Sequence, residues 1–317
     1  MVFDRFYERI ELGMQPRPRL IPSKPVRPQI VKERSSKRER SWQNFDLMFE
    51  DIVQRAFAED LPDITSEAIF APSDRGSAKF LVKGDGVIAG LAVVETVFRM
   101  LDPNAAVELL ARDGDVVRPG DLIATVNASV IALLSGERTA LNLLQRASGI
   151  ATMTRRYADA IAGTKAKVYD TRKTAPGLRE LDKYAVRAGG GENHRIGLHD
   201  MFLVKNNHVD RAGSITAAVQ RIRAKQMPQP VMVEVRDLKE LDEALAQQPD
   251  FILLDNMTPE QLREAVARTN GRVPLEASGG ITLETIRAVA ETGVERISVG
   301  ALTHSVVALD ISMRMKL

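Results

Sequence analysis

The sequence predicts an α/β protein whose larger part is an incomplete (β/α) barrel. From about residue 166 onward, short apolar runs that read as strands alternate with amphipathic helical segments. Such alternation is typical of a parallel sheet covered by helices. Six of these units are present, fewer than a closed barrel of this kind contains, so we expect an incomplete barrel.

The residues that end the six strands favour a barrel over an open sheet. Each strand ends at a polar residue or a glycine, in the order Arg172, Lys205, Glu234, Asp255, Ser278 and Gly300. A barrel places its active site at the carboxyl ends of all its strands, whereas an open doubly wound sheet concentrates chemistry at one switch point. We therefore expect one active site, built from all six strand ends.

Residues 1–40 differ in composition from the rest of the chain. They hold eleven Lys and Arg against five Asp and Glu, a net charge of 11 − 5 = +6, and they are rich in proline. This composition predicts a flexible leader, with one short helix over 3–13. The leader lacks the apolar core of a secretory signal, and its early acidic residues disfavour a transit peptide. We therefore expect a cytoplasmic protein.

Two folded domains are expected to follow the leader. The first covers 41–133, where apolar residues at helical spacing predict a helix over 45–60, followed by short strands joined by Gly-Asp and Pro-Gly turns. The second, over 134–302, is the barrel domain. It should begin with a long helix over 135–163 that has Ser135 as its N-cap and Arg138 in its first turn.

The composition of the whole chain excludes several classes of protein. The 317 residues carry a formal net charge of +2 and contain no cysteine. This balance predicts no nucleic-acid partner, and the absence of cysteine excludes disulfides and thiol chemistry. No apolar run approaches the roughly 20 residues of a membrane-spanning helix, so we expect no membrane partner.

The last two strand ends predict a phosphate site. Ser278, Gly279 and Gly280 follow one strand and Gly300 follows the next. Barrels often bind a phosphate at this place through backbone N–H groups. Each glycine could form a simple turn, but their occurrence on consecutive strands favours phosphate binding.

Two acidic residues end adjacent strands and should face the same pocket. The carboxylates of Glu234 and Asp255 suit Mg²⁺, which binds hard oxygen ligands and keeps several waters. They could instead act as general acid and base, or as partners of nearby cations. The pattern favours metal involvement, direct or through water.

Positive residues gather around the same strand ends. Arg172, Lys173, Arg195 and Lys205 lie close to the predicted pocket, together with His194. A single lysine there could form a Schiff base, but several cations together favour anion binding. Arginine binds carboxylates bidentately, so this group can hold a dicarboxylate as well as phosphates. The other three histidines have no zinc-like spacing.

Several of these segments resemble the quinolinate phosphoribosyltransferase family. The resemblance covers about residues 45–312, and only small departures occur, such as Ala175 in place of a common threonine. The segments that carry it are SGERTALNLLQRASGIAT, DTRKTAPGLRELDKYAVRAGGGENHRIGLHDMFLVKNNH, VEVR, LLDNM, EASGG and SVGALTHS.

The resemblance implies an N-terminal open-faced α/β sandwich domain beside the barrel, with the last helix, within 303–317, packing back on the N-terminal domain. It implies a homodimer with shared active sites, in some members assembled into hexamers. It also implies the family's reaction, in which quinolinate and phosphoribosyl pyrophosphate give nicotinate mononucleotide, pyrophosphate and CO₂, with Mg²⁺ as cofactor.

The resemblance further implies roles for residues of this chain. Quinolinate would be held by Arg172, Lys173, His194, Arg195 and Arg138 of the neighbouring subunit. Phosphoribosyl pyrophosphate would be engaged by Lys205, Glu234, Asp255 and Mg²⁺. Its 5-phosphate would be bound by Ser278, Gly279, Gly280 and Gly300. The residues expected to take part in catalysis are Lys173, Lys205, Glu234 and Asp255.

Three alternatives remain open on the sequence alone. Molybdenum-associated homologues share the arginine-rich segment, but we expect them to lack the KNNH pattern that is present at 205–208. A nicotinate phosphoribosyltransferase would bind a monocarboxylate and would need fewer cations. A non-catalytic ligand-binding homologue would have gaps in the ring of charges, whereas here every matched position is occupied.

Overall fold

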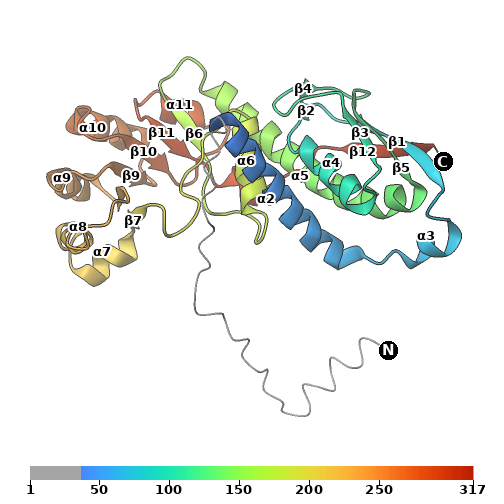
Figure 1. Cartoon of the computed structure of the whole chain (residues 1–317). Coiled ribbons are helices and arrows are strands. Elements are labelled where there is room, and N and C mark those ends of the chain that lie inside the picture. Colours follow the sequence, from blue (N-terminus) through green and yellow to red (C-terminus); the bar gives the residue numbers. More distant parts are fainter. Residues whose placement is uncertain (1–36, 317) are drawn as a thin grey trace, which may run out of the picture. The chain divides into compact units, whose positions relative to one another are not determined.

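The computed structural model describes residues 37–316 (Figure 1). The predicted helix over 3–13 and most of the predicted leader lie outside these residues. Helix α2 (Lys37–Asp60) begins earlier than the predicted helix over 45–60, and its Phe49, Ile52 and Val53 are buried as the apolar spacing indicated. None of the helices within residues 37–316 combines the length and the apolar character that a membrane-spanning segment needs.

The N-terminal domain is built on a four-stranded antiparallel sheet with helices against it (Figure 1). The strand order is β12-β1-β5-β3, and β2 and β4 form a separate two-stranded ladder. The elements are α3 (Ile64–Ile69), β1 (Arg75–Val82), β2 (Gly86–Val87), α4 (Leu91–Leu101), β3 (Ala106–Leu109), β4 (Val116–Val117), β5 (Leu122–Ser129) and β12 (Ile311–Lys316). Helix α4 was not predicted from the sequence pattern.

The C-terminal end returns to this domain as a strand, which corrects the helix implied by the family resemblance. β12 pairs antiparallel with β1 along the register from Ser77–Lys316 to Val82–Ile311. Ile311 and Met313 are buried while Arg314 is exposed. This alternation with a period of two residues suits a strand with one buried face, and it excludes the apolar stripe of a helix.

Helix α5 (Val130–Ala160) also begins earlier than predicted. Its N-cap is Ser129, whose hydroxyl accepts a hydrogen bond from the Ala132 backbone N–H at 3.2 Å. Ser135, the predicted N-cap, lies inside the helix and donates to the Asp63 carboxylate at 3.1 Å. The apolar run begins directly after Ser129, so that residue is the one that caps the helix. The predicted domain boundary after residue 133 therefore falls within α5.

The second domain is an incomplete parallel barrel, as predicted. Its six strands pair in the order β6-β11-β10-β9-β8-β7, so β6 and β7 are the two open edges. All six predicted strands are present, and each pairs in parallel with its neighbours. They are β6 (Lys167–Tyr169), β7 (Phe202–Val204), β8 (Val231–Val235), β9 (Phe251–Asp255), β10 (Leu275–Ser278) and β11 (Arg296–Ser298).

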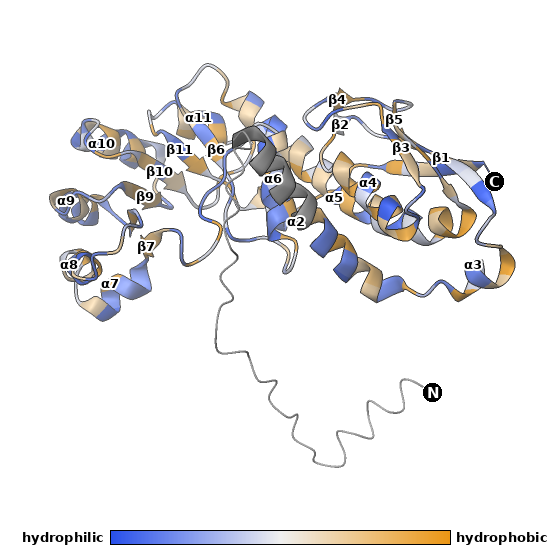
Figure 2. Cartoon of the chain, in the orientation of Figure 1, coloured by the Kyte–Doolittle hydropathy of each residue, from blue (hydrophilic) through white to orange (hydrophobic). Residues whose placement is uncertain are grey.

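Helices α8 (Ile215–Arg223), α9 (Leu238–Ala246), α10 (Pro259–Thr269) and α11 (Ile286–Ala290) cover the outer side of this sheet (Figure 1). The domain also contains α6 (Arg179–Ala188), which packs on α5, α7 (Asn206–Ala212), which packs on α8, and the short α12 (Ala301–His304), which follows β11. Helices α8 to α10 carry hydrophilic residues on one side and apolar residues on the other (Figure 2). Leu241 and Leu262 are buried on the apolar sides of α9 and α10, and every residue of β8 is buried. The strand ends are therefore held by a well-packed frame.

Candidate active site

A pocket of about 750 Å³ lies at the carboxyl ends of the barrel strands. It brings together every predicted site residue except Arg138. Those residues are Arg172, Lys173, His194, Arg195, Lys205, Glu234, Asp255, Ser278, Gly279, Gly280 and Gly300. Residues that are far apart in the sequence meet here because parallel strands end at the same edge of the sheet.

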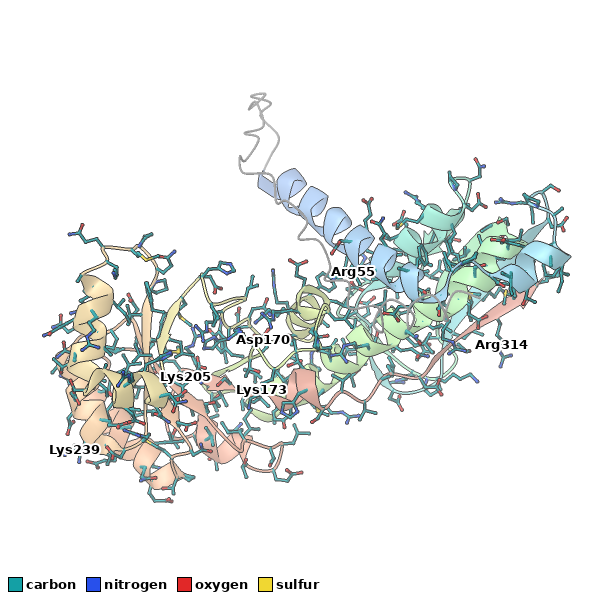
Figure 3. The ribbon with its side chains drawn as sticks, turned by 90° about the horizontal axis from the view of Figure 1, so that it is seen from below. Arg55, Asp170, Lys173, Lys205, Lys239 and Arg314 are labelled. Atoms are coloured by element: carbon teal, nitrogen blue, oxygen red, sulfur yellow. The ribbon has the colours of Figure 1, made fainter. Side chains whose placement is uncertain are left out.

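Only some of the cationic side chains labelled in Figure 3 line the pocket. Lys173, which follows β6, and Lys205, which follows β7, both line the pocket. Lys239 on α9 and Arg314 on β12 lie elsewhere on the molecule and do not line it. The pocket therefore gathers a particular subset of the cations of the chain.

Two of these cations, Arg172 and Arg195, line the pocket without an ion pair to any described residue. The Nε atom of Arg172 is buried and has no hydrogen-bonding partner within residues 37–316. The guanidinium of Arg195 donates to the Met201 carbonyl at 3.1 Å. Burial lowers the pKa of Arg195, and the charge of Arg172 lowers it further, while Asp200 opposes the shift. The pair is therefore poised to bind an anion with more than one negative group.

A lysine and a carboxylate form an ion pair on the next strand ends. Lys205 Nζ lies 2.9 Å from Glu234 Oε2, and the Glu234 side chain is buried while that of Lys205 is half exposed. Asp255, at the end of the adjacent β9, is partly buried and makes no ion pair with any described residue. Of these two carboxylates, Glu234 is therefore neutralised by a lysine and Asp255 is not.

Glu234 and Asp255 are the residues of the pocket that could hold a metal ion. Among residues 37–316, no group of three or more His, Asp or Glu side chains could hold a metal ion. Glu234 and Asp255 nevertheless both line the pocket and offer hard oxygen atoms. Mg²⁺ keeps several waters and takes substrate phosphate oxygens as ligands. The two residues therefore fit an Mg²⁺ ion that is bound mainly by a phosphate-bearing substrate.

The loop after β10 has a backbone that only glycine adopts readily. Gly279 has φ +97° and Gly280 has φ +60°. A Cβ atom at Gly279 would collide with the Oδ1 atom of Asn256, whereas one at Gly280 would meet open space. Asn256 also donates its backbone N–H to the Ser278 carbonyl at 2.8 Å. The loop can therefore bring backbone groups close to a ligand, as a phosphate site requires.

A buried network that the sequence analysis did not identify supports the cationic side of the pocket. Asp170 accepts hydrogen bonds from the Lys183 ammonium and from the His194 backbone N–H, the latter at 2.8 Å. Lys183 also donates to the His194 carbonyl at 3.0 Å. Burial raises the pKa of Asp170, although Lys183 opposes this shift. The network fixes the segment that carries His194 and Arg195.

The pocket contains other residues that the sequence analysis did not name as part of the site. Some follow directly on a predicted strand end, so a wider window around each end could have found them. Glu276 differs, because it lies within β10 and is fully buried. The missed lining residues are Thr171, Leu203, Leu253, Asn256, Glu276, Ile281, Thr282, Ser298, Val299, Ala301 and His304.

Arg138 is the one predicted site residue that the pocket does not include. It is exposed on α5 and makes no ion pair within the described residues. Its proposed role in the site of a neighbouring subunit therefore stays a prediction.

Comparisons with known proteins match both domains. Residues 63–148 match the quinolinate phosphoribosyl transferase N-terminal domain, and residues 150–314 match its C-terminal domain. A protein of Bacillus subtilis (strain 168), named probable nicotinate-nucleotide pyrophosphorylase (carboxylating), is 44% identical over 274 residues, or 86% of this chain and 94% of the relative. The nicotinate-nucleotide pyrophosphorylase (carboxylating) of Mycobacterium leprae (strain TN) is 45% identical, over 83% and 95% of the two chains.

A solved structure agrees with these matches. The crystal structure of nicotinate-nucleotide pyrophosphorylase from Ehrlichia chaffeensis superposes with a TM-score of 0.81 at 38% identity. The superposition covers 84% of this chain and 98% of the other. Both domains and their connection are thus shared with that protein.

Proposed function

The chain belongs to the quinolinate phosphoribosyltransferase family, and we propose that the pocket at the mouth of its barrel carries out that family's reaction. The enzyme is a carboxylating nicotinate-nucleotide pyrophosphorylase. It transfers the phosphoribosyl group of phosphoribosyl pyrophosphate to quinolinate, with loss of CO₂. The products are nicotinate mononucleotide, pyrophosphate and CO₂, and the reaction serves NAD synthesis.

The observation that carries this proposal is the pair of unneutralised arginines. Arg172 and Arg195 line the same pocket, and the positive charge of Arg172 lowers the pKa of Arg195. Two like charges are held together at a cost unless an anion binds between them. Quinolinate carries two adjacent carboxylates, and arginine binds carboxylates through paired hydrogen bonds. We assign quinolinate to this side of the pocket, with Lys173 and His194 beside it.

We assign phosphoribosyl pyrophosphate to the opposite side. The loop of Ser278, Gly279 and Gly280, with Gly300 on the next strand end, would bind its 5-phosphate through backbone N–H groups. Lys205 would interact with the pyrophosphate, which carries the largest negative charge in the reactants. The anomeric carbon would then lie between the two halves of the pocket, within reach of quinolinate.

The chemistry needs charge and positioning more than a covalent intermediate. The ring nitrogen of quinolinate forms a bond to the anomeric carbon, and the electron pair of the breaking bond leaves with pyrophosphate. Glu234 and Asp255 would stabilise the positive charge that develops on the sugar. The nitrogen is then quaternary, so the ring accepts the electron pair as the 2-carboxylate leaves as CO₂. A proton from solvent completes the product at that carbon.

We also propose that Mg²⁺ takes part, held by Glu234 and Asp255 directly or through water. When bound, the ion supplies positive charge to the pyrophosphate oxygens. Lys205 is already paired with Glu234 at 2.9 Å, so it can orient that carboxylate as well as attract the substrate.

We further propose a cytoplasmic homodimer with shared active sites. Arg138 is exposed on α5 and does not line the pocket of its own chain. An arginine from a second copy would add a third cation to the quinolinate side.

The quinolinate assignment can be tested by removing one charge at a time. Arg172→Gln and Arg195→Gln should each raise KM for quinolinate by about tenfold or more, the loss of a charge-assisted hydrogen bond, and should change KM for phosphoribosyl pyrophosphate much less. Lys239→Gln is the matched control, because Lys239 is an exposed cation outside the pocket. An unchanged KM for quinolinate in both arginine variants would contradict the assignment.

A further inference from the structure

Glu276 is a buried carboxylate beneath the quinolinate side of the pocket. It lies on β10 and has no exposed surface. Its Oε2 atom accepts a hydrogen bond from Arg296 Nε at 2.7 Å. The Arg296 guanidinium in turn lies over the rings of Tyr169 and Phe251, at 3.8 and 4.8 Å from their centroids. Arg296 thus holds the Oε2 atom of Glu276 in place.

The other carboxylate oxygen lies near His194. Glu276 Oε1 is 3.3 Å from His194 Nε2, longer than a usual N–H···O hydrogen bond, and no described group donates a well-aligned hydrogen bond to it. Burial raises the pKa of Glu276, but the charges and hydrogen bonds around it, among them the ion pair with Arg296, hold it below its ordinary value. The carboxylate is therefore ionised and accepts hydrogen bonds only.

The two ring nitrogens of His194 both face groups of the protein. Nδ1 accepts a hydrogen bond from the Arg195 backbone N–H at 2.7 Å, so it carries no proton. We therefore place the proton on Nε2, which faces the Glu276 carboxylate. The His194 residue is only 8% exposed. The ring therefore has no further N–H group with which to bind a carboxylate of the substrate.

Arg195 needs such support because its surroundings repel it. Its guanidinium lies close enough to Arg172 for that charge to lower its pKa, and its side chain donates a hydrogen bond to the Met201 carbonyl. The positive charge of Arg172 repels the Arg195 side chain, so a fixed backbone at Arg195 helps to keep that side chain in the pocket. His194 Nδ1 fixes the Arg195 N–H, and Asp170 fixes the His194 N–H.

We propose that Glu276 is a positioning residue for quinolinate binding: it orients the neutral ring of His194, which in turn holds Arg195 in place to bind the substrate. This proposal rests on the assignment of quinolinate to the pocket. It gives His194 a different task from direct binding through its ring nitrogens. Glu276 and His194 then affect quinolinate affinity only through Arg195.

The first test measures quinolinate binding to the full-length protein by calorimetry in a set of combined variants. Glu276→Gln and His194→Asn should each weaken binding about tenfold, as the loss of a hydrogen bond that orients a charged group does, and leave KM for phosphoribosyl pyrophosphate near that of the wild type. In an Arg195→Gln background the same changes should have no further effect on quinolinate affinity. An undiminished effect in that background would overturn the proposal. His194→Asn leaves the Glu276–Arg296 ion pair intact, so this variant alone can test the proposal if Glu276→Gln does not fold stably.

The second test reads the proton positions on His194 without using activity. The chain contains four histidines, so histidine-selective ¹⁵N labelling gives few ring signals, and His194→Asn identifies the one of interest. The proposal predicts a protonated Nε2 and an unprotonated Nδ1, both without ligand and with saturating quinolinate. Protonation of both nitrogens on quinolinate binding would overturn it while leaving the proposed function intact. Failure of the wild type to bind quinolinate would overturn the proposed function, and this proposal with it.

Discussion

Lys205 Nζ lies 2.9 Å from Glu234 Oε2, although 29 residues separate them in the sequence. Glu234 is the buried penultimate residue of β8, and Lys205 directly follows β7, the neighbouring strand in the sheet. The parallel register brings the two strand ends to one edge and so makes the pair. Glu234 thereby places a carboxylate in the pocket, and Lys205 orients this carboxylate.

Removal of either carboxylate charge should slow the chemical step. Glu234→Gln and Asp255→Asn are expected to lower kcat by about 10- to 100-fold and to change quinolinate affinity little, because the charge they stabilise develops in the transition state. Steady-state kinetics with both substrates varied would measure this. Asp242→Asn on the outer face of α9 is the control, since Asp242 pairs with Arg268 away from the pocket. Wild-type turnover in both pocket variants would contradict the assignment.

The two glycines after β10 should differ in their tolerance of alanine. Both have positive φ, but only at Gly279 would the new methyl group collide with Asn256. Gly279→Ala should raise KM for phosphoribosyl pyrophosphate by about tenfold or more, whereas Gly280→Ala should carry mainly the cost of its backbone conformation, on the order of 1 kcal/mol. Equal effects of the two changes would show that the collision with Asn256 does not shape the phosphate site.

Asp102 is expected to make the stability of the N-terminal domain sensitive to acid. Its buried carboxylate accepts backbone N–H groups from Ser129 and Asn104 at 2.8 and 2.9 Å and pairs with Arg75. Burial raises the pKa of Asp102, but these partners outweigh it and lower the pKa below the ordinary 3.8. A lowered folded-state pKa means that the stabilisation is present above pH 3.8 and is lost as the pH falls through the folded-state pKa.

Asp102→Asn should therefore destabilise the protein at pH 7 by about 1–3 kcal/mol, the cost of weakening buried hydrogen bonds to a charged group. The difference from the wild type should shrink as the pH drops below 3.8. Thermal unfolding at several pH values measures this difference, with Asp85→Asn, at an exposed residue, as the control. A difference that stays constant down to pH 3 would contradict the account.

Arg138 and Lys205 should belong to one active site made by two subunits. Arg138→Ala and Lys205→Ala homodimers are each expected to be nearly inactive. In a mixed dimer, a shared arrangement gives one site both defects and the other site neither. Mixing equal amounts should restore about one quarter of wild-type activity, because half of the dimers are mixed and each of these has one intact site. No recovery, with subunit exchange verified by mass spectrometry, would place Arg138 in the site of its own chain or outside it.

The barrel and its mouth could be predicted because they depend on local pattern. Runs such as that around Ile252 and Leu254 are apolar for the length of one strand, and the first polar residue after them, Asp255, marks the strand end. Strand ends of a parallel sheet meet by topology alone. The pocket residues could therefore be named before any contact between them was known.

Features that depend on distant partners could not be predicted in this way. Ser129 and Ser135 are both reasonable N-caps, and the structure uses Ser135 to bind Asp63 instead. Helix α4 was missed because Val93, Val94 and Val97 are β-branched and read equally well as strand residues. Glu276 is an ordinary strand residue in sequence, and its importance follows only from its contacts with His194 and Arg296.

The most direct test of the central claim is to supply the purified protein with quinolinate labelled in its 2-carboxylate, phosphoribosyl pyrophosphate and Mg²⁺. We predict that nicotinate mononucleotide, pyrophosphate and labelled CO₂ form in equal amounts, and that nicotinate in place of quinolinate gives little product. Absence of product from correctly folded protein, or equal turnover of nicotinate without release of CO₂, would contradict the account.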